Sequence, residues 1–490
     1  MHTGQRRFGS SHRLLLAAAC LLAIVVACTL NPATGQRQLT LIGEQQEIAL
    51  GRENDQLIEA QMGLYENEEL QSYVNELGQR LAALSERPHL PWQFHVMDDP
   101  TVNAFALPGG FIYVTRGILA HFNSEAELVS VLGHEIGHVT ARHSVEQMSR
   151  MQLAQLGLGV AMIASEDARQ YAGLASMGLQ VLFLKFGRDD ETQADELGFR
   201  YMHKASYDVH EMPGVFEMLD RHSQLMGGQR LPEWQSTHPN PGNRADHIRQ
   251  RIANLPPGQH GDIVNRNEYK RRLQDLVYGS DPREGYTIGS TFYHPQMAFR
   301  VNFPEGWKII NQKQAVVSVS EEQDAVIVLT IADESNPGQA ADAFFSAEGI
   351  RRGSSWKNNF HNFSTVPETD PQTGAQQSFH GAVGFVPHDG RVYRLLAYSP
   401  SDRWKGYAAT GRRAIASFRR LPNGPYLNVK PERLEIVEIS SPMTLERFNG
   451  RKASNIPIEE LAILNGVDPT ETMPPGTLVK RVTGGRVPTS

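Results

Sequence analysis

The sequence predicts an α+β fold divided among several domains, and three observations lead to this prediction. The chain has 490 residues, which is too long for a single hydrophobic core. Apolar residues recur at helical spacing before residue 255, whereas short alternating runs typical of strands follow Tyr286. Hydrophobic residues make up 40% of the chain and charged residues 21%. This is the composition of a folded soluble protein, and it excludes disordered, collagen-like and multi-span membrane chains.

Charge and cysteine content exclude further classes of function. The net charge of -7 provides no general electrostatic footprint for nucleic acid, so no nucleic-acid partner is expected. The two cysteines, Cys20 and Cys28, both lie before residue 30. The rest of the chain therefore has no thiol for catalysis, for zinc ligation or for a disulfide framework.

The N-terminal segment has the pattern of an export signal. Three arginines precede an uncharged stretch from Leu14 to Ala27, which is too short for a membrane-spanning helix. The sequence Val25-Val26-Ala27-Cys28 resembles a bacterial lipobox, which implies that residues 1–28 form a lipoprotein signal peptide and that Cys28 is lipidated. Thr29 follows the cysteine, and by resemblance to the sorting rule of such lipoproteins this implies the periplasmic face of the outer membrane. An uncleaved anchor with an incidental cysteine is the alternative.

The region after this signal predicts helices around a small sheet. Two amphipathic helices are expected between Gly43 and about Arg87, where apolar residues lie three and four positions apart. Residues 92–96 alternate between apolar and polar, and the apolar run Phe111–Val114 follows a Pro-Gly-Gly turn. These patterns predict the strands of the small sheet.

Longer helices are expected next. Ser124 and Glu127 have the spacing of a capping box, and apolar periodicity continues from there to about Met148. This pattern predicts one central helix. Further helices are expected over Asp189–Met202 and from about Arg244.

Two apolar stretches follow the central helix, Leu153–Ala164 and Tyr171–Leu184, with Glu166, Asp167 and Arg169 between them. Each is too short to cross a bilayer. We expect a buried helical hairpin; a surface groove or a membrane-leaning patch is the alternative.

Shifts in composition divide the chain after the signal into four segments. Residues 29–255 carry the helical patterns described above, and residues 256–285 are polar and contain Pro256-Pro257-Gly258, as expected for a linker. Residues 286–421 alternate as strands with two helical pieces, which predicts an α+β accessory domain without a catalytic constellation. Residues 422–490 form a small C-terminal unit.

The sequence His134-Glu135-Ile136-Gly137-His138 carries the clearest chemistry. Two histidines four positions apart on a helix differ by about 40° in direction, so both imidazoles can reach one metal ion. Glu135 then lies beside the metal, where it can accept a proton from a metal-bound water and pass it to a leaving amine. Coincidence is the alternative for a motif of this length.

A hydrolytic zinc site needs a third protein ligand. A metzincin ligand is excluded, because Ala141 and Ser144 stand where that subclass has glycine and histidine. His143 lies about 140° around the helix from His138, so a surface position is expected for it. Glu191 and Asp195 share a face of the next helix, where Glu191 would ligate the metal and Asp195 would orient a ligand histidine. An ordinary acidic helix N-terminus is the alternative.

These residues resemble the zinc endopeptidase family typified by the CAAX prenyl protease and the HtpX heat-shock protease. The resemblance covers roughly residues 30–255, and its opening looks like the lipoprotein branch of that family. It implies a mostly helical, gluzincin-type zinc peptidase domain over residues 29–255 with a small edge sheet. It also implies one Zn2+ per chain on His134, His138 and Glu191, with Glu135 as the general base. The matching pieces are Asn31-Pro32-Ala33-Thr34-Gly35, Asn103 to Gly110, Leu132 to His138, Glu191 to Asp195, Thr237-His238-Pro239 and Arg244.

The resemblance implies roles for three further pieces of the chain. His238 would lie near the open zinc position, where it could stabilise the oxyanion or occupy the fourth coordination site in a resting form; a loop histidine without a role is the alternative. Arg244 would hold the active-site acids, unless it is a surface arginine. The strand Phe111–Val114 could pair with substrate backbone at a sheet edge.

The C-terminal unit, residues 422–490, resembles a LysM-like glycan-binding module in Leu461–Gly466 and Pro475–Lys480. Pro442-Met443-Thr444 replaces the usual Gly-Asp-Thr of such modules. An accessory domain with an unknown ligand and a peptidoglycan-binding module are both open interpretations.

The family resemblance implies a lipid-anchored zinc endopeptidase that hydrolyses misfolded or misassembled envelope proteins. Its expected partners are those substrates, the membrane through Cys28, and peptidoglycan. Two rival functions are an envelope assembly factor or chaperone with a latent zinc site, and a hydrolase of peptidoglycan peptides. Mn2+ or Co2+ could occupy the same ligands as Zn2+.

Overall fold

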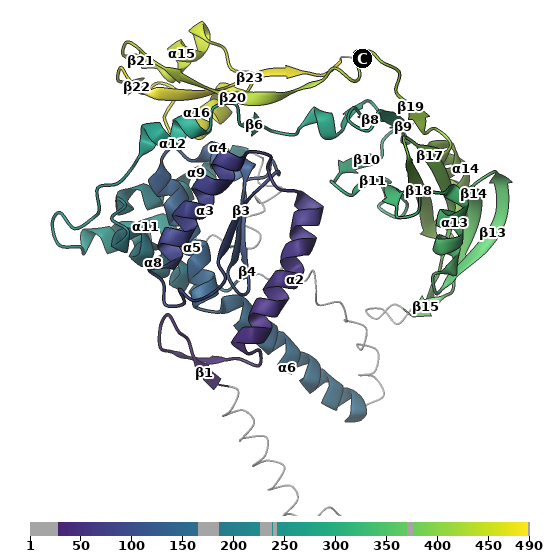
Figure 1. Ribbon diagram of the computed structural model, residues 1–490, viewed down its shortest axis with the longest axis horizontal. Coiled ribbons are helices and arrows are strands. Elements are labelled where there is room, and N and C mark those ends of the chain that lie inside the picture. The colour runs from purple at the N-terminus through teal and green to yellow at the C-terminus, as the bar shows by residue number, and fades with distance from the viewer. Residues whose placement is uncertain (1–27, 165–185, 226–237, 239–242, 370–375, 489–490) are drawn as a thin grey trace, which may run out of the picture.

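The computed structural model describes residues 28–164, 186–225, 238, 243–369 and 376–488. Figure 1 shows a helical part on one side, a sheet part on the other, and two long C-terminal strands that run across the top of the helical part. The expected signal peptide and the second apolar stretch, Tyr171–Leu184, lie outside the described residues. No helix in the described ranges has the length and apolar character needed to span a bilayer.

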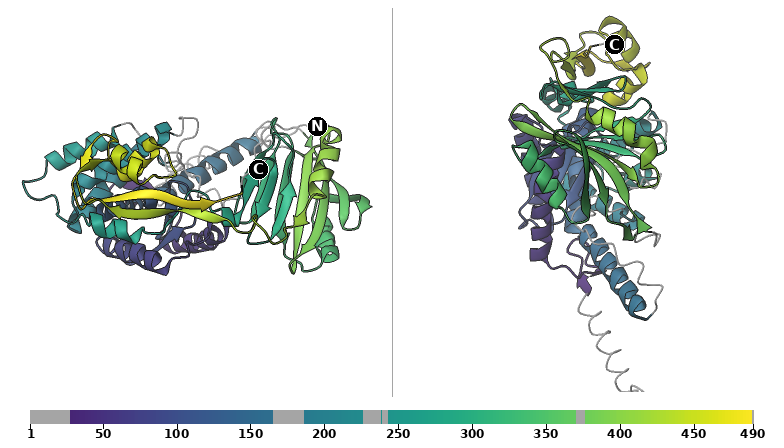
Figure 2. Two further views of the ribbon diagram at one scale, coloured as in Figure 1. Left: turned by 90° about the horizontal axis from the view of Figure 1, so that it is seen from above. Right: turned by 90° about the vertical axis from the view of Figure 1, so that its right-hand side faces the viewer.

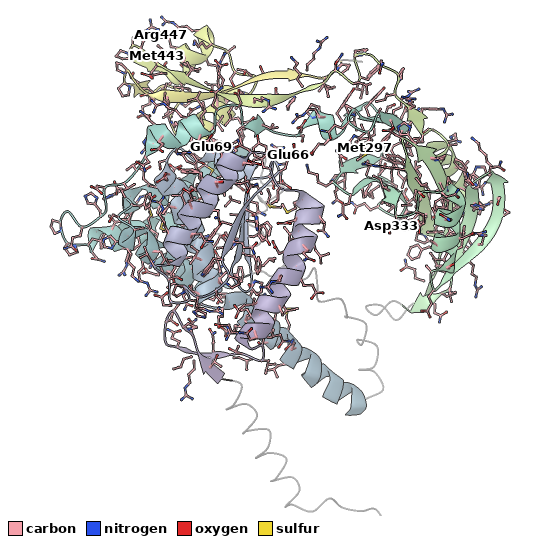
Figure 3. All side chains as sticks on the ribbon, in the orientation of Figure 1. Glu66, Glu69, Met297, Asp333, Met443 and Arg447 are labelled. Atoms are coloured by element: carbon pink, nitrogen blue, oxygen red, sulfur yellow. The ribbon has the colours of Figure 1, made fainter. Side chains whose placement is uncertain are left out.

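The helical part begins with a short hairpin, β1 (Cys28–Leu30) and β2 (Arg37–Leu39), and with two helices, α2 (Glu44–Met62) and α3 (Glu68–Ala82). The two helices confirm the prediction made from apolar spacing. Asn67 caps α3, because its side chain accepts a hydrogen bond from the backbone N–H of Leu70. Glu69 in the first turn of α3 forms an ion pair with Arg272 beneath the C-terminal unit (Figure 3).

The small sheet has three strands in the order β3-β5-β4. They are β3 (Gln93–Met97), β4 (Ala104–Leu107) and β5 (Phe111–Thr115). The expectation that Phe111–Val114 offers a free edge is wrong, because β5 is the central strand and is paired on both sides. Every residue of β5 is buried, which explains its continuous apolar run. The edge that packs against α5 is β4.

The central helix, α5 (Glu125–Thr140), follows the short helix α4 (Arg116–His121). Ser124 caps α5, as predicted, because its side chain accepts a hydrogen bond from the backbone N–H of Glu127. The return bond differs from that of a capping box, since the carboxylate of Glu127 accepts the backbone N–H of Asn123 instead of that of Ser124. The prediction of one helix to Met148 is wrong. The chain breaks at Arg142, which has a φ of 60°, and α6 (His143–Ala164) begins as a new helix.

Helix α8 (Arg188–Lys204) packs directly on α5. Their contact depends on glycine, because a Cβ on Gly198 would lie 2.8 Å from the backbone nitrogen of His134. This close approach brings the side chains of Glu191 and Asp195 to the histidine motif. The other elements of the helical part are η3 (Val209–Glu211), α9 (Met212–Leu225) and α11 (Arg244–Ala253).

The segment 256–285 differs from the expected linker. It contains α12 (Arg266–Arg272), β6 (Val277–Tyr278) and η4 (Pro282–Glu284). Tyr269 and Leu273 are fully buried in the core of the helical part. The hydroxyl of Tyr269 donates to the carbonyl of Leu119 at 2.7 Å. Apolar side chains spaced four apart in a polar segment therefore anchor it to the core.

The sheet part, residues 286–421, contains a seven-stranded antiparallel sheet of order β10-β11-β12-β18-β17-β14-β13 and a four-stranded sheet of order β19-β9-β8-β7. Helix α14 packs with Ala382 and Leu395 on one face of the larger sheet, and α13 packs with Val383 and Phe385 on the other. The helices therefore flank that sheet (Figure 2). The bounds are β7 (Tyr286–Ile288), β8 (Thr291–His294), β9 (Phe299–Asn302), β10 (Lys308–Asn311), β11 (Ala315–Val319), β12 (Val326–Ala332), α13 (Pro337–Ser346), β13 (Ile350–Lys357), β14 (Phe360–Thr365), β15 (Glu368–Thr369), β16 (Gln376–Gln377), β17 (Phe379–His388), β18 (Arg391–Pro400), α14 (Trp404–Ile415) and β19 (Arg419–Arg420).

The C-terminal unit consists of two long strands that pair antiparallel with each other and of two helices that lie between them in the sequence. Its elements are β20 (Lys430–Glu438), β21 (Met443–Thr444), α15 (Leu445–Arg451), α16 (Ile458–Asn465), β22 (Thr472–Met473) and β23 (Leu478–Arg486). The side-chain nitrogen of Lys480 is fully buried and donates to the carbonyls of Ala120 and Phe122, just before the cap of α5. Apolar residues of the unit share one continuous core with the helical part.

Candidate metal centre

Four side chains that can bind a metal converge inside the helical part. His134 and His138 come from α5, Glu191 comes from α8, and His238 approaches from the segment before α11. Nε2 of His138 lies 3.0 Å from Nε2 of His134 and 3.4 Å from Oε1 of Glu191. Nδ1 of His238 lies 2.9 Å from Oε1 of Glu191 and 3.3 Å from Nε2 of His134. All four residues are buried.

These distances fit one tetrahedral metal ion. Ligand atoms placed 2.0–2.1 Å from zinc at tetrahedral angles lie about 3.3–3.4 Å apart. Four of the distances between these ligand atoms are 2.9, 3.0, 3.3 and 3.4 Å, close to that value. Imidazole nitrogens and a carboxylate are also the ligand types that zinc prefers.

Glu135 lies beside this cluster and is fully buried. Its Oε1 lies 3.7 Å from Nε2 of His238. Within the described part of the chain, neither carboxylate oxygen of Glu135 accepts a hydrogen bond. A buried carboxylate is costly without a partner, so both oxygens are suited to hold a water at this position and to take its proton.

Asp195 and Arg244 contact the metal-ligating residues His134 and Glu191. Nδ1 of His134 lies 2.9 Å from Oδ1 of Asp195 and donates to it, which turns Nε2 toward the cluster. Arg244 is buried at the start of α11. Its guanidinium donates to both oxygens of Asp195, at 2.6 and 2.8 Å, and lies 3.1 Å from Oε2 of Glu191. A surface position for Arg244 is therefore ruled out.

The charges of the site favour metal binding. Burial lowers the pKa of His138 well below its usual value, so its imidazole is neutral and has a lone pair. Burial alone would raise the pKa of Glu191, but the positive charge of His238 and its hydrogen bond to the carboxylate hold that pKa well below the usual range. Burial likewise opposes the charge of Asp195, and the guanidinium of Arg244 outweighs it, so the pKa of Asp195 is lowered.

His143 is not on the surface, and the expectation from helical geometry is wrong. Because α5 ends at Thr140, His143 starts a new helix, and its position does not follow from the turn of α5. The side chain is buried, and its Nδ1 lies 2.9 Å from Nδ1 of His138.

A chain of hydrogen bonds determines which nitrogen of each ring carries the proton. Asn31 donates through Nδ2 to Oε1 of Gln193, at 3.1 Å, so this oxygen is an acceptor. Nε2 of His143 lies 2.9 Å from the same oxygen and donates to it. Nδ1 of His143 is then the acceptor for Nδ1–H of His138. Consequently His138 presents the lone pair of Nε2 to the cluster.

The places of Gln193 and His143 in this series of hydrogen bonds could not be predicted from the sequence. Asn31 anchors it to the N-terminal segment, since its Nδ2 also donates to the carbonyl of Ala141. Asn31 and Gln193 each lie in a segment that carries the family resemblance, and that was the only signal available.

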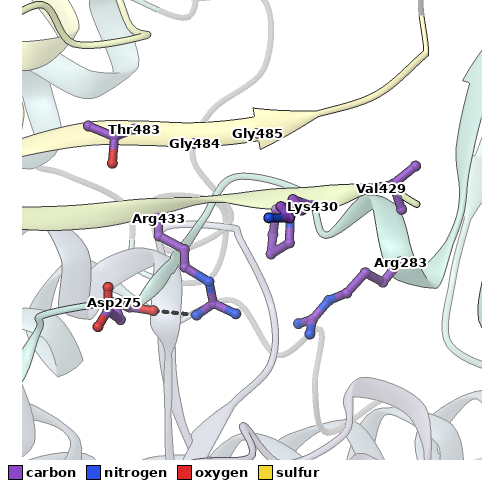
Figure 4. A pocket seen from close by; sticks show the side chains of 9 residues that line it. Asp275, Arg283, Val429, Lys430, Arg433, Thr483, Gly484 and Gly485 are labelled. Carbon is purple, nitrogen blue, oxygen red and sulfur yellow. Dashed lines mark hydrogen bonds between the residues drawn. The ribbon is translucent and has the colours of Figure 1, made fainter. Parts of the chain in front are cut away.

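Two cavities lie away from the cluster. One, of about 610 Å3, lies between the helical and sheet parts and is lined by Met297, Asp98 and Arg116, among others; Figure 3 shows Met297 on the side of the sheet part that faces the helical part. The other, of about 360 Å3, is basic and is lined by Arg283, Lys430 and Arg433 under the end of the C-terminal hairpin (Figure 4).

Known proteins resemble this chain over the same region. The family model for peptidase family M48 matches residues 68–252. A putative beta-barrel assembly-enhancing protease of Vibrio cholerae is 29% identical over 253 residues, 50% of this chain and 52% of that protein. The beta-barrel assembly-enhancing protease of Yersinia pestis is 30% identical over 275 residues, 54% of this chain and 56% of that protein. The mitochondrial metalloendopeptidase OMA1 of Arabidopsis thaliana is 36% identical over 170 residues, 34% of this chain and 33% of that protein. This chain spans about half the length of the two bacterial relatives.

Proposed function

We propose, from the premise that residues 68–252 belong to peptidase family M48, that this chain is a zinc-dependent endopeptidase. Its substrates are misfolded or misassembled proteins of the bacterial cell envelope, and lipid on Cys28 holds it at the periplasmic face of the outer membrane. The observation that carries the proposal is the convergence of His134, His138 and Glu191 with Glu135 buried beside them.

In the proposed mechanism His134, His138 and Glu191 would hold one Zn2+, which would supply a Lewis acid to polarise the peptide carbonyl and to lower the pKa of water. Glu135 accepts the proton of the attacking water and passes it to the leaving amine. Asp195 keeps the ring of His134 in its ligating orientation. The charge of Arg244 outweighs burial and keeps Asp195 ionised, and the same guanidinium forms an ion pair with Glu191.

His238 supports a resting form of the enzyme. Its Nδ1 lies within 3.3 Å of ligand atoms from both His134 and Glu191, which is the place of a fourth ligand. A substrate carbonyl needs the same place, so His238 must move for substrate to bind. Once moved, its imidazole can donate a hydrogen bond to the oxyanion.

The substrate backbone is proposed to pair with β4. This strand lies at the edge of the sheet and packs against α5, which carries the catalytic motif. Pairing through main-chain groups selects extended chains and little sequence, which suits unfolded proteins. Folded proteins do not offer such a free segment.

The envelope location rests on two supports. Two bacterial relatives are named beta-barrel assembly-enhancing proteases, and the lipobox-like sequence ends at Cys28. Mass spectrometry of the chain purified from membranes tests the lipid anchor, and an unmodified Cys28 would remove it.

The proposal also includes the division into domains: a peptidase domain over residues 29–255, an accessory domain over 286–421, and a LysM-like domain over 422–490.

The activity is tested by comparing three substrates: an unfolded outer-membrane protein, the same protein folded, and purified sacculi. The proposal predicts cleavage of the unfolded protein alone, and loss of cleavage after chelation. Release of peptides from sacculi would favour the peptidoglycan hydrolase. A wild-type chain that holds zinc and accelerates barrel assembly without cutting any of these substrates would favour the assembly factor with a latent site.

A further inference from the structure

A second group of metal-ligating side chains lies on the helical part, outside the centre described above. Asp208 precedes η3, His210 lies within η3, and His260 lies in the turn after α11. Helix α8 separates this group from the first centre, because Glu191 lies near its start and Asp208 follows its end. At 1.5 Å per helical residue, the two groups are about 20 Å apart.

The three ligand atoms lie within 4.8 Å of one another. Oδ1 of Asp208 lies 2.7 Å from Nδ1 of His210, a hydrogen bond that a cation would replace, and 3.6 Å from Nδ1 of His260. The two imidazole rings are 4.8 Å apart and inclined at 71°. Ligand atoms at 2.0–2.1 Å from one ion, with angles between 90° and 109°, are separated by about 2.8–3.4 Å. The two distances from Asp208 need a shift of only a few tenths of an ångström to meet this range.

The backbone under the group is held in place. The N–H of Val209 donates to the carbonyl of His260 at 3.0 Å, and the N–H of Asp208 donates to the carbonyl of Ile263 at 3.0 Å. Gly261 lets the two segments approach, because a Cβ there would lie 2.1 Å from the carbonyl oxygen of Tyr207. The three side chains therefore extend from a fixed frame.

The ring of His260 has an unused nitrogen that faces the group. Nδ1 of His260 is closed off from solvent, and no residue in the described ranges forms a hydrogen bond with it. Its distance of 3.6 Å to Asp208 is too long for such a bond. Meanwhile Oδ1 of Asp208 accepts the backbone N–H of His210, which keeps the carboxylate turned inward. A cation between these atoms would satisfy His260.

We propose that Asp208, His210 and His260 form a second binding site for a first-row divalent cation, with Zn2+ as the expected ion. Two imidazoles and one carboxylate are ligands that zinc accepts, and the half-exposed histidines leave room for water to complete the shell. The ion ties the end of α8 to the end of α11. These helices carry Glu191 and Arg244, so a second zinc braces the frame of the first centre.

The test measures bound zinc in the full-length chain. Wild type, His260→Gln and Asp208→Asn are dialysed against the same buffered concentration of free Zn2+, and metal per chain is counted. Asp208→Asn keeps the oxygen that caps η3 but removes the charge. His247→Gln is the matched control, because it removes a half-exposed histidine from α11 outside the group.

The proposal predicts that wild type and His247→Gln bind one more zinc per chain than either of the other two variants. Zinc should also raise the melting temperature of wild type more than that of His260→Gln. Equal zinc counts in wild type and both group variants would overturn the proposal. This outcome is independent of the proposed function, because the counts do not depend on cleavage and the first centre is intact in every variant.

Discussion

Replacing His143 by alanine tests how strongly the first metal centre depends on residues that do not touch the metal. His143 accepts the N–H of His138 at 2.9 Å in a site from which water is excluded. Without it, the buried donor of His138 loses its partner, which costs about 1–3 kcal/mol. The ring of His138 also loses its orientation. Removal of such outer partners typically weakens metal binding by about 10–100-fold, or about 1.4–2.7 kcal/mol.

The affinity for zinc is measured by competition with a chromophoric chelator. We expect His143→Ala to bind zinc 10–100-fold more weakly than wild type. Gln193→Leu should weaken binding less, because His143 remains in place. The double variant should lose no more than His143→Ala alone, since Gln193 reaches His138 through His143. The control His247→Ala should be neutral. Wild-type affinity in His143→Ala, or additive losses in the double variant, would refute the chain of hydrogen bonds.

Four further predictions concern stability and metal binding. Arg244→Ala leaves the carboxylate of Asp195 buried without its counter-charge, so the free energy of unfolding measured in urea should fall by about 3–5 kcal/mol; a change below 1 kcal/mol would contradict the ion pairs. Gly198→Ala pushes α8 away from the backbone of His134, so both stability and zinc affinity should fall; a change in neither would contradict the close helix contact. Burial lowers the pKa of Lys270 to about 8, so between pH 8 and about pH 10.5 the unfolded state holds a proton that the folded state has released. The free energy of unfolding should therefore rise over this pH range, by at most about 3 kcal/mol. The Lys270→Met variant should show a flatter dependence on pH. Removal of zinc by chelation should lower the melting temperature, and added zinc should restore it; no shift would contradict binding to the folded state.

Much of the helical part could be predicted because its signals are local. Apolar spacing predicts α2, α3 and α8, and the cap at Ser124 predicts the start of α5. The ligand histidines share a helix face for the same local reason. The approach of Glu191 to them depends on α8 packing against α5, which spacing within one helix does not reveal.

The missed features are tertiary. Arg142 adopts a left-handed conformation that ends the helix pattern, and it is held there by Glu47, with 2.9 Å between its Nε and the carboxylate. Nothing near Arg142 in the sequence signals this contact, so helical geometry alone predicts the wrong position for His143. Likewise, an apolar run such as Phe111–Val114 is typical of a strand, but it does not distinguish a central strand from an edge strand.

Zinc content and cleavage, measured together in wild type and Glu135→Gln, test whether Glu135 acts as the general base at a zinc site. Glu135 touches no other described side chain by a hydrogen bond, so its amide should leave the zinc ligands in place. We expect one zinc at the first centre in both proteins, cleavage of an unfolded envelope protein by wild type, and a loss of about 10²–10⁴-fold in Glu135→Gln. Equal cleavage rates in the two zinc-loaded proteins would show that Glu135 is not the general base.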